Sequence, residues 1–303
     1  MKIKTKDLLT LDELTKDELS KIIDLAIKLK KDLKKGKNQP LLKNKTLAMI
    51  FQKPSTRTRV SFEVGMFQLG GHALNLSSDD LQLSRGESIE DTAKALSRYV
   101  DVIMARVYDH KTIETLAKNS SVPVINGLSN SFHPCQTLAD LMTIKEKKRK
   151  LSGLKIAWIG DGNNVCNSLI YGCSKSGINI SVATPRGYEP DSKVVKQAKK
   201  SIKIEITTHP LTSAKNADVV MTDTFSSIHN RDPKRIKRFF PKFQVNPSVM
   251  KTAKNNAIFL HCLPAKRGNE VTSSVIDGPK SVVWDEAENR LHTEKALLLS
   301  MSI

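Results

Sequence analysis

Four short clusters of polar residues stand where apolar stretches end, and their side chains suit the binding of anions and amides. In the first, residues 53–59 (KPSTRTR), an apolar stretch ends at Phe51, Pro54 breaks it and Ser55 opens a predicted helix. The first-turn amides of a helix lack intrahelical partners, and the helix dipole adds positive potential. With the hydroxyls and Arg57 they predict a phosphate site without Walker glycines. The alternative is an ordinary helix cap, in which Arg57 would oppose the dipole.

The second cluster, residues 132–141 (FHPCQTLADL), places His133 and Gln136 at the start of a predicted helix. A neutral imidazole can donate to a carbonyl oxygen, and a carboxamide offers both a donor and an acceptor to an amide-like group. A polar helix cap is an equally open interpretation of these residues.

The third and fourth clusters are residues 158–169 (WIGDGNNVCNSL) and 261–272 (HCLPAKRGNEVT). The third resembles a dinucleotide loop but lacks the strict G-x-G-x-x-G pattern, so it is a weak sign of NAD. Its two asparagines could instead hydrogen-bond an amino-acid substrate. In the fourth, Cys262 beside His261 could be a nucleophile or a buried residue at the end of a strand.

The elements that must position these clusters are short apolar strands that alternate with amphipathic helices. This pattern predicts an α/β fold with parallel sheets flanked by helices, which bind ligands at the carboxyl ends of their strands. Strands are expected at residues 46–51, 72–76 and 101–105, and a second series starts at Lys155 and includes residues 281–286 (SVVWDE). A first helix is expected over residues 10–35, capped by Thr10 or Asp12. We expect a first domain at 1–148, a second at 149–285 and a helix at 286–303 that packs back on the first domain.

Composition excludes several classes of protein. The chain has 303 residues and a formal net charge of +18. Its basic runs are scattered and carry no interleaved aromatic residues, which favours a solvated surface over nucleic-acid binding. No stretch approaches the roughly 20 apolar residues of a membrane span, and the N-terminus has no apolar signal region, so a cytoplasmic protein is expected. The four cysteines form no C-x-x-C pair, which predicts neither a zinc ribbon nor a disulfide framework.

In combination and order, the four clusters resemble those of the aspartate/ornithine carbamoyltransferase family. The matching segments are Ser55-Thr-Arg-Thr-Arg59, His133-Pro-Cys-Gln136, Asp161-Gly-Asn-Asn164 and His261-Cys-Leu-Pro264, and the resemblance covers essentially the whole chain. The HCLP tetrapeptide resembles the ornithine branch. The resemblance implies carbamoyl transfer from carbamoyl phosphate to the δ-amine of L-ornithine, which gives L-citrulline and phosphate in arginine biosynthesis. It also implies a cleft site between two domains, a homotrimer with shared active sites, and no metal or redox cofactor.

The resemblance implies a role for each matching position. The residues implied for carbamoyl phosphate are Ser55, Thr56, Arg57, Thr58, Gln82 (from the neighbouring subunit), Arg106, His133, Gln136, Cys262, Leu263 and Arg290. Those implied for ornithine are Asn164, Asp223, Ser227 and Ile228. Arg106, His133 and Cys262 are expected to be catalytic. Arg106, His133 and Thr58 would donate to the developing oxyanion. Cys262 or Asp223 would orient or deprotonate the attacking amine.

Two places depart from the family pattern. Phe225, Ile228 and His229 stand where the family has Trp, Met and Gly, and Lys266 stands where it has His. Losing the glycine removes a residue that tolerates positive φ, so this loop is expected to close differently. Putrescine, lysine or an acylated ornithine are therefore rival substrates. A Rossmann oxidoreductase, which leaves the first two clusters unexplained, and a basic nucleic-acid-binding protein are rivals from other classes.

Overall fold

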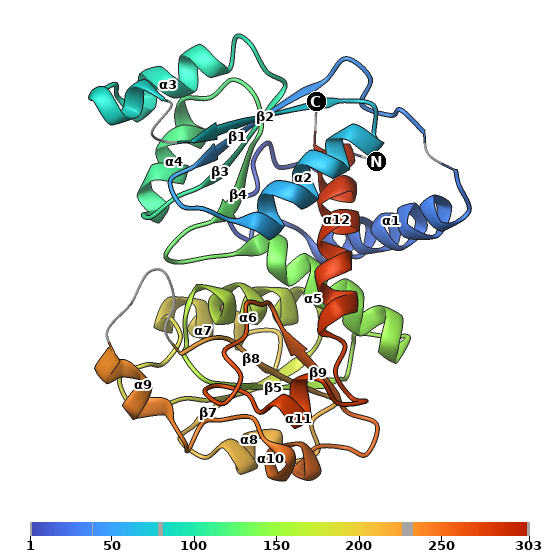
Figure 1. The fold of residues 1–303 in the computed structure, drawn as a ribbon, viewed down its shortest axis with the longest axis vertical. Coiled ribbons are helices and arrows are strands. Elements are labelled where there is room, and N and C mark those ends of the chain that lie inside the picture. The colour runs from blue at the N-terminus through green and yellow to red at the C-terminus, as the bar shows by residue number, and fades with distance from the viewer. Residues whose placement is uncertain (1, 38, 78–80, 226–232, 302–303) are drawn as a thin grey trace. The chain divides into compact units, whose positions relative to one another are not determined.

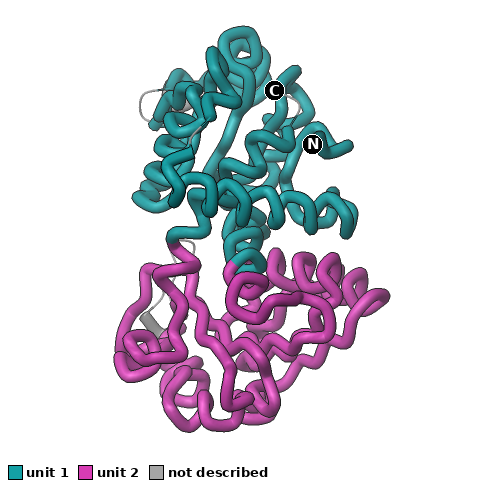
Figure 2. Tube along the Cα trace, turned by 90° about the vertical axis from the view of Figure 1, so that its right-hand side faces the viewer, with its two compact units in different colours: residues 1–142, 288–303 teal, residues 143–287 magenta. Residues whose placement is uncertain are grey.

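A computed structural model describes residues 2–37, 39–77, 81–225 and 233–301. The chain divides into two compact units, residues 1–142 with 288–303 and residues 143–287 (Figure 2). Each unit is built on its own parallel sheet with flanking helices (Figure 1), which confirms the predicted fold class. In the described part of the chain, no helix is both long and apolar enough to span a membrane.

The sheet of the first unit has the strand order β2-β1-β3-β4. Its strands are β1 (Thr46–Phe51), β2 (His72–Ser77), β3 (Val102–Arg106) and β4 (Val124–Leu128). β1, β3 and β4 are almost wholly buried, as strands covered on both faces must be. Sequence reasoning missed β4, because its run VINGL contains Asn and Gly, which are poor strand formers.

The helices of the first unit cover both faces of this sheet. They are α1 (Lys16–Lys34), α2 (Thr56–Gln68), η2 (Gln82–Arg85), α3 (Ile89–Leu96), α4 (His110–Asn119), α5 (Pro134–Lys148) and α12 (Val283–Ser300), the last two of which extend into the second unit. Residues of α3 and α4, such as Ala93 and Ile113, pack on the face formed by alternate residues of β1 and β3. The expected cap of α1 was wrong: Thr15 caps it and forms a capping box with Glu18.

The sheet of the second unit has the order β7-β6-β5-β8-β9. Its strands are β5 (Lys155–Ile159), β6 (Asn179–Ala183), β7 (Ile204–Thr207), β8 (Val219–Thr222) and β9 (Ile258–His261). The remaining helices are α6 (Asn164–Ser176), α7 (Ser192–Ala198), α8 (Pro210–Ala214), α9 (Pro233–Phe239), α10 (Pro247–Thr252) and α11 (Ser273–Ile276). The chain runs outward in opposite directions from β5 and β8, so the gap between the ends of these two strands is a topological switch point.

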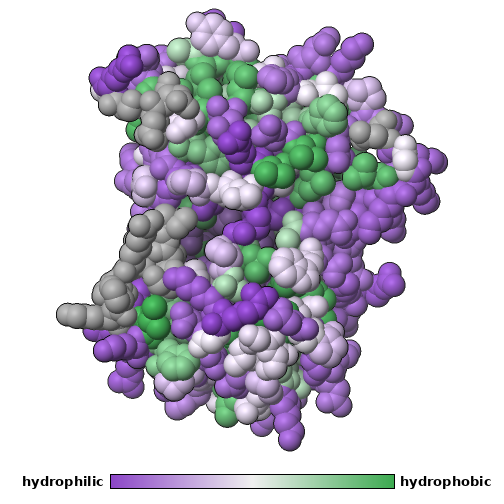
Figure 3. Space-filling view, in the orientation of Figure 1, coloured by the Kyte–Doolittle hydropathy of each residue, from purple (hydrophilic) through white to green (hydrophobic). Residues whose placement is uncertain are grey.

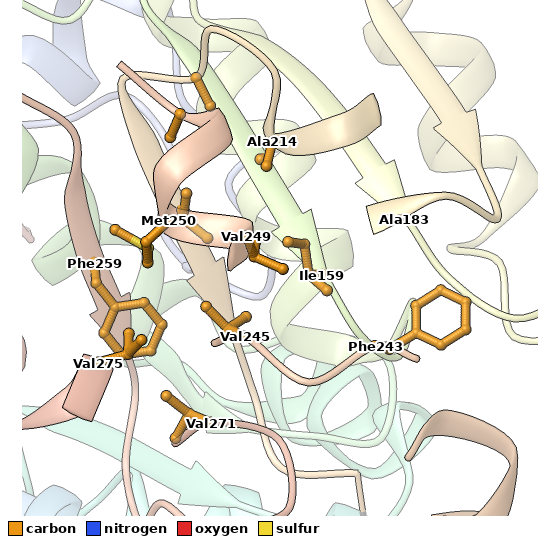
Figure 4. Packing of buried hydrophobic residues seen from close by; sticks show 14 of the residues in the cluster. Ile159, Ala183, Ala214, Phe243, Val245, Val249, Met250, Phe259, Val271 and Val275 are labelled. Atoms are coloured by element: carbon orange, nitrogen blue, oxygen red, sulfur yellow. The ribbon is translucent and has the colours of Figure 1, made fainter. Parts of the chain in front are cut away.

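A large apolar cluster fills one face of the second sheet (Figure 4). Ile159 of β5 and Phe259 of β9 pack there against Val249 and Met250 of α10 and Val275 of α11. The strand expected at residues 281–286 was wrong. Ser281 makes only an isolated bridge with Phe259, and α12 begins at Val283, where Asp285 and Glu286 suit the positive end of a helix.

Candidate active site

The first predicted cluster lies at the amino end of α2, directly after β1. Ser55 has extended backbone angles and its hydroxyl accepts a hydrogen bond from the Thr58 amide at 3.4 Å. The capping alternative therefore describes Ser55 correctly. α2 has no acidic residue in its first turn, and Arg57 lies there instead. First-turn amides, the helix dipole and a cation make this helix end suitable for a phosphate group.

Arg106 ends β3 beside this loop. It pairs in register with Phe51, and its carbonyl accepts the Gln52 amide at 2.9 Å. Its side chain is buried. Lys53 is also buried, with its ammonium nitrogen 3.9 Å from the centre of the Tyr108 ring. Burial and the neighbouring Arg106 lower the pKa of Lys53 to about 8. Two buried cations therefore lie near the end of α2, where an anion would relieve their repulsion.

His133 and Gln136 begin α5, at the end of β4. The His133 carbonyl accepts the amides of Gln136 (3.2 Å) and Thr137 (3.4 Å), and both side chains are buried. Gln136 donates through Nε2 to Asp140 Oδ1 at 2.9 Å. Its carbonyl oxygen accepts from Arg290 Nη1 at 2.9 Å. These contacts fix which end of the Gln136 carboxamide is the donor and which is the acceptor.

Arg290 joins the first two clusters. Besides Gln136, its guanidinium contacts the Thr58 hydroxyl at 3.2 Å. The structure thus brings Thr58, Gln136 and Arg290 into one buried network, with Ser55, Thr56 and Arg57 on the same helix end. Cys135, inside the second cluster, is a packing residue: burial raises the pKa of its thiol to about 12.

Gln82 does not join this network. It lies in η2 and is exposed, and among the described residues its side chain has no hydrogen-bond partner. Its predicted role in a neighbouring subunit's site stays a prediction.

In the second unit, three polar side chains meet at the switch point. Asn163 caps α6 by accepting from the Val165 and Cys166 amides, and its Nδ2 donates to Asp223 Oδ2 at 2.8 Å. Asp223, which follows β8, accepts the Cys262 thiol through Oδ1 at 3.2 Å. The predicted pair Asp223 and Cys262 is therefore in direct contact. Asn164, predicted to bind ornithine, is buried one residue further into α6.

Hydrogen bonds of the buried His261 side chain stabilise the turn that carries Cys262. Leu263 has a φ of 57°, which is unusual for a residue with a side chain, and its amide donates to His261 Nδ1 at 2.9 Å. His261 Nε2 lies 3.2 Å from Glu270 Oε1, and both residues are fully buried. Ligand atoms of Asp223, His261 and Cys262 lie within 4.8 Å of one another, close enough for a metal ion. Because both imidazole nitrogens already have these partners, we assign the cluster no metal.

The glycine-containing loop of the third cluster packs against the segment that follows β6, at residues 188–190. Gly162 donates its amide to the Tyr188 carbonyl at 2.8 Å, and a Cβ on Gly162 would lie 2.2 Å from the Pro190 nitrogen. This glycine is required for internal packing, whereas a dinucleotide loop needs it for the approach of a pyrophosphate. The packing argues against the oxidoreductase alternative.

An ion pair holds the other end of this loop. Arg235 of α9 pairs with Asp161, donates to the Phe225 carbonyl at 3.1 Å and lies over the Tyr188 ring. Burial raises the pKa of Asp161 to about 6, although Arg235 opposes the shift. Phe225 is buried and stacks on Phe239, with ring centres 5.0 Å apart. Ser227, Ile228 and His229 lie outside the described residues, so their predicted roles stay predictions.

Comparison with known families covers both units. A family described as "Aspartate/ornithine carbamoyltransferase, carbamoyl-P binding domain" matches residues 6–146. Another, described as "Aspartate/ornithine carbamoyltransferase, Asp/Orn binding domain", matches residues 152–301. This chain belongs to the aspartate/ornithine carbamoyltransferase family.

Individual carbamoyltransferases are similar over their full length. The chain is 62% identical to an ornithine carbamoyltransferase of Cenarchaeum symbiosum, over 303 residues and 100% of both chains. The solved ornithine carbamoyltransferase of Pyrococcus furiosus has a TM-score of 0.94 and 55% identity, covering 98% of this chain and 96% of that one. The anabolic enzyme of Campylobacter jejuni has a TM-score of 0.90 and 42% identity, covering 97% and 98%.

Several residues of the site were missed at the level of sequence, including by the resemblance to carbamoyltransferases. Asn163 was noted in its motif but was given no role in the site, whereas in the structure its side chain contacts Asp223. Its position directly before α6, where an asparagine commonly caps a helix, was the signal that could have identified it. Lys53 stood in the first cluster without a role. Glu294, which bonds Arg290, gave no signal beyond its spacing of four residues on a predicted helix.

Proposed function

We propose that this chain is an ornithine carbamoyltransferase. It transfers the carbamoyl group of carbamoyl phosphate to the δ-amine of L-ornithine, and releases L-citrulline and phosphate for arginine biosynthesis. The observation that carries the choice of amine is the contact between the Asp223 carboxylate and the Cys262 thiol.

The first unit supplies the chemistry that carbamoyl phosphate needs. Ser55, Thr56, Arg57 and Thr58 at the helix end would bind the phosphate, and its charge grows as it leaves. Arg106 and His133 would donate to the carbamoyl oxygen, where negative charge develops as the amine attacks. Gln136 and Arg290, already joined by a hydrogen bond, would hold the amide end.

The second unit supplies a negative charge for a cationic amine. The Asp223 carboxylate, which accepts the Cys262 thiol, is the anionic group of this site. Such a charge attracts ornithine and repels the second carboxylate of aspartate. Asp223 or Cys262 would orient the amine. Asp223 would take the proton directly, or Cys262 would take it after passing its own thiol proton to the Asp223 carboxylate. Asn164, with Ser227 and Ile228, would bind the α-amino and α-carboxyl groups, and the Leu263 carbonyl would contact the carbamoyl amide.

An assay over several amines tests this proposal. Carbamoyl phosphate is supplied with ornithine, putrescine, lysine, N-acetylornithine or aspartate, and the carbamoylated product and phosphate are measured. We expect strong preference for ornithine. Preference for another amine would refute the substrate but keep the carbamoyl phosphate site. Arg57→Ala is the companion variant: it should lose carbamoyl phosphate binding in calorimetry while its melting temperature stays near that of the wild type.

We also propose a homotrimer in which Gln82 enters a neighbour's site. Support comes from a groove of about 1070 Å³ in the first unit, lined by Ser55, Thr56 and exposed apolar residues of α2. Phe67 there is 81% exposed, and hydrophobic residues gather over α2 in Figure 3. An exposed apolar patch of this kind is typical of a protein interface. Sedimentation should give the mass of three chains, and Phe67→Glu should shift it towards one.

We also propose that the protein resides in the cytoplasm. No disulfide joins any of the four cysteines, all of which lie in the described part of the chain. Three of them are buried, as reduced cysteines usually are. Cysteines persist in this form in a reducing compartment, which supports the proposal. Fractionation of the source cells, with the enzyme assayed in each fraction, tests it.

A further inference from the structure

The guanidinium of Arg290 is held by four hydrogen bonds within the first unit. Nε and Nη2 both donate to Oε1 of Glu294, at 3.0 Å and 2.7 Å. Nη2 also donates to the Thr58 hydroxyl, and Nη1 to the Gln136 carbonyl oxygen. A guanidinium has five N–H groups. Among the residues that the structure describes, these bonds leave one N–H, on Nη1, for a ligand.

Glu294 is the member of this network to which no role has yet been given. It lies one turn after Arg290 in α12, and its side chain is only 1% exposed. Burial raises the pKa of the Glu294 carboxyl, and Arg290 opposes that shift. A buried carboxylate beside a phosphate site repels the phosphate and lowers its affinity. We therefore expect Glu294 to have another effect that favours the site.

The hydrogen bonds between Glu294 and Arg290 indicate what this effect is. One carboxylate oxygen receives two of the five N–H groups, which fixes the plane of the guanidinium. Two of the three remaining N–H groups then point to Thr58 and Gln136, on α2 and α5. Without Glu294 the charge of Arg290 would be buried without its counter-ion, which is strongly unfavourable.

We propose that Glu294 is the positioning residue of the anion site: it fixes Arg290 and, through its own negative charge, weakens the binding of phosphate so that the product can leave. The inference rests on the proposed function, because it takes Arg290 as a ligand of carbamoyl phosphate. Glu294 does not touch the substrate and acts only through Arg290 and its charge.

The test separates geometry from charge with two variants of the full-length protein. Glu294→Gln keeps the size and an acceptor oxygen but removes the charge, so inorganic phosphate should bind roughly five- to tenfold more tightly in calorimetry. Glu294→Leu removes the acceptor as well, so phosphate should bind at least about tenfold more weakly than to the Gln variant. In kinetics, KM for carbamoyl phosphate should change in both variants, and KM for ornithine in neither.

Glu288→Gln is the matched control. It makes the same charge change on the same helix, but Glu288 is 40% exposed and pairs with Lys30. Solvent screens its charge, so phosphate affinity should change less than about twofold. Thermal denaturation of each variant checks that it is folded.

Three results would overturn the inference: wild-type phosphate affinity in Glu294→Gln, equal losses in the Gln and Leu variants, or an equal gain in Glu288→Gln. Phosphate binding needs no amine, so it is independent of the substrate assay. If the wild type forms citrulline and Glu294→Gln binds phosphate as the wild type does, only this inference fails. If the wild type carbamoylates no amine but the phosphate shifts appear, the proposed function fails and the role of Glu294 stands.

Discussion

Raising the pH from 7 to 9 should weaken carbamoyl phosphate binding through Lys53. Burial and Arg106 lower the pKa of this lysine to about 8. A bound phosphate group favours the charged ammonium, so anion binding and protonation of Lys53 are linked. Protonated Lys53 attracts the anion, and neutral Lys53 does not.

The size of the effect follows from this pKa. With a pKa of about 8, roughly nine-tenths of the lysine is protonated at pH 7 and roughly one-tenth at pH 9. If the protonated form is the one that binds, the Kd for carbamoyl phosphate should rise about tenfold over this range, or about 1.4 kcal/mol. The phosphate group itself is already largely dianionic at pH 7, because its second pKa is about 6. Its own titration therefore contributes little.

Calorimetry without ornithine is the appropriate assay, since it avoids the titration of the amine. Lys53→Arg keeps a cation whose pKa lies far above this range, so its Kd should stay nearly constant from pH 7 to pH 9. Lys53→Met should bind weakly at both values. A tenfold rise that persists unchanged in the Arg variant would refute the reasoning, because another group would then be titrating.

Three further substitutions test the second unit. Asn163→Ala should cost about 1 kcal/mol of stability through the lost cap, and should raise KM for ornithine roughly tenfold because Asp223 loses a hydrogen bond. Arg235→Met should destabilise the fold by roughly 2–3 kcal/mol at pH 8. The pKa of Asp161 is raised to about 6, so the folded state binds the extra proton below that pH, and the loss should be smaller at pH 5 in thermal denaturation. Gly162→Ala should cost at least about 2 kcal/mol, because its Cβ would meet the Pro190 nitrogen.

Each of these variants has a matched control. Asn246 caps α10 as Asn163 caps α6 but is not assigned to the site, so Asn246→Ala should lower stability and leave KM unchanged. Arg267 forms an exposed pair with Asp277, so Arg267→Met should leave stability close to that of the wild type. A Cβ on Gly65 would come no nearer than 3.3 Å to another heavy atom, the Cγ of Lys295, so Gly65→Ala should be tolerated. Equal effects in a variant and its control would contradict the assigned contact.

The pattern of residues along the chain was sufficient to predict the class of fold and the chemistry of the clusters. Short apolar strands that alternate with helices can bury their surface only as parallel sheets with covered faces. Polar residues that follow such strands come to one edge of a sheet, which is why the residues around Ser55, His133 and Cys262 could be singled out in advance. Arg106 was assigned only through the resemblance to the family. For the residues around Ser55, the local order of a strand, a break and a capped helix was enough.

Which of these residues come into contact depends on the three-dimensional fold. Asn163 and Asp223 are 60 positions apart, and Arg290 bonds Thr58 across 232 positions, so no local pattern reports either contact. The run at residues 281–286 was misread for the same reason: two buried valines suit a strand or a buried helix start equally well. The burial of Lys53 and the partnership of Glu294 with Arg290 also depend on neighbours supplied by other elements. The exposure, pKa and hydrogen-bond partners of these side chains depend on packing, which involves residues from many parts of each unit.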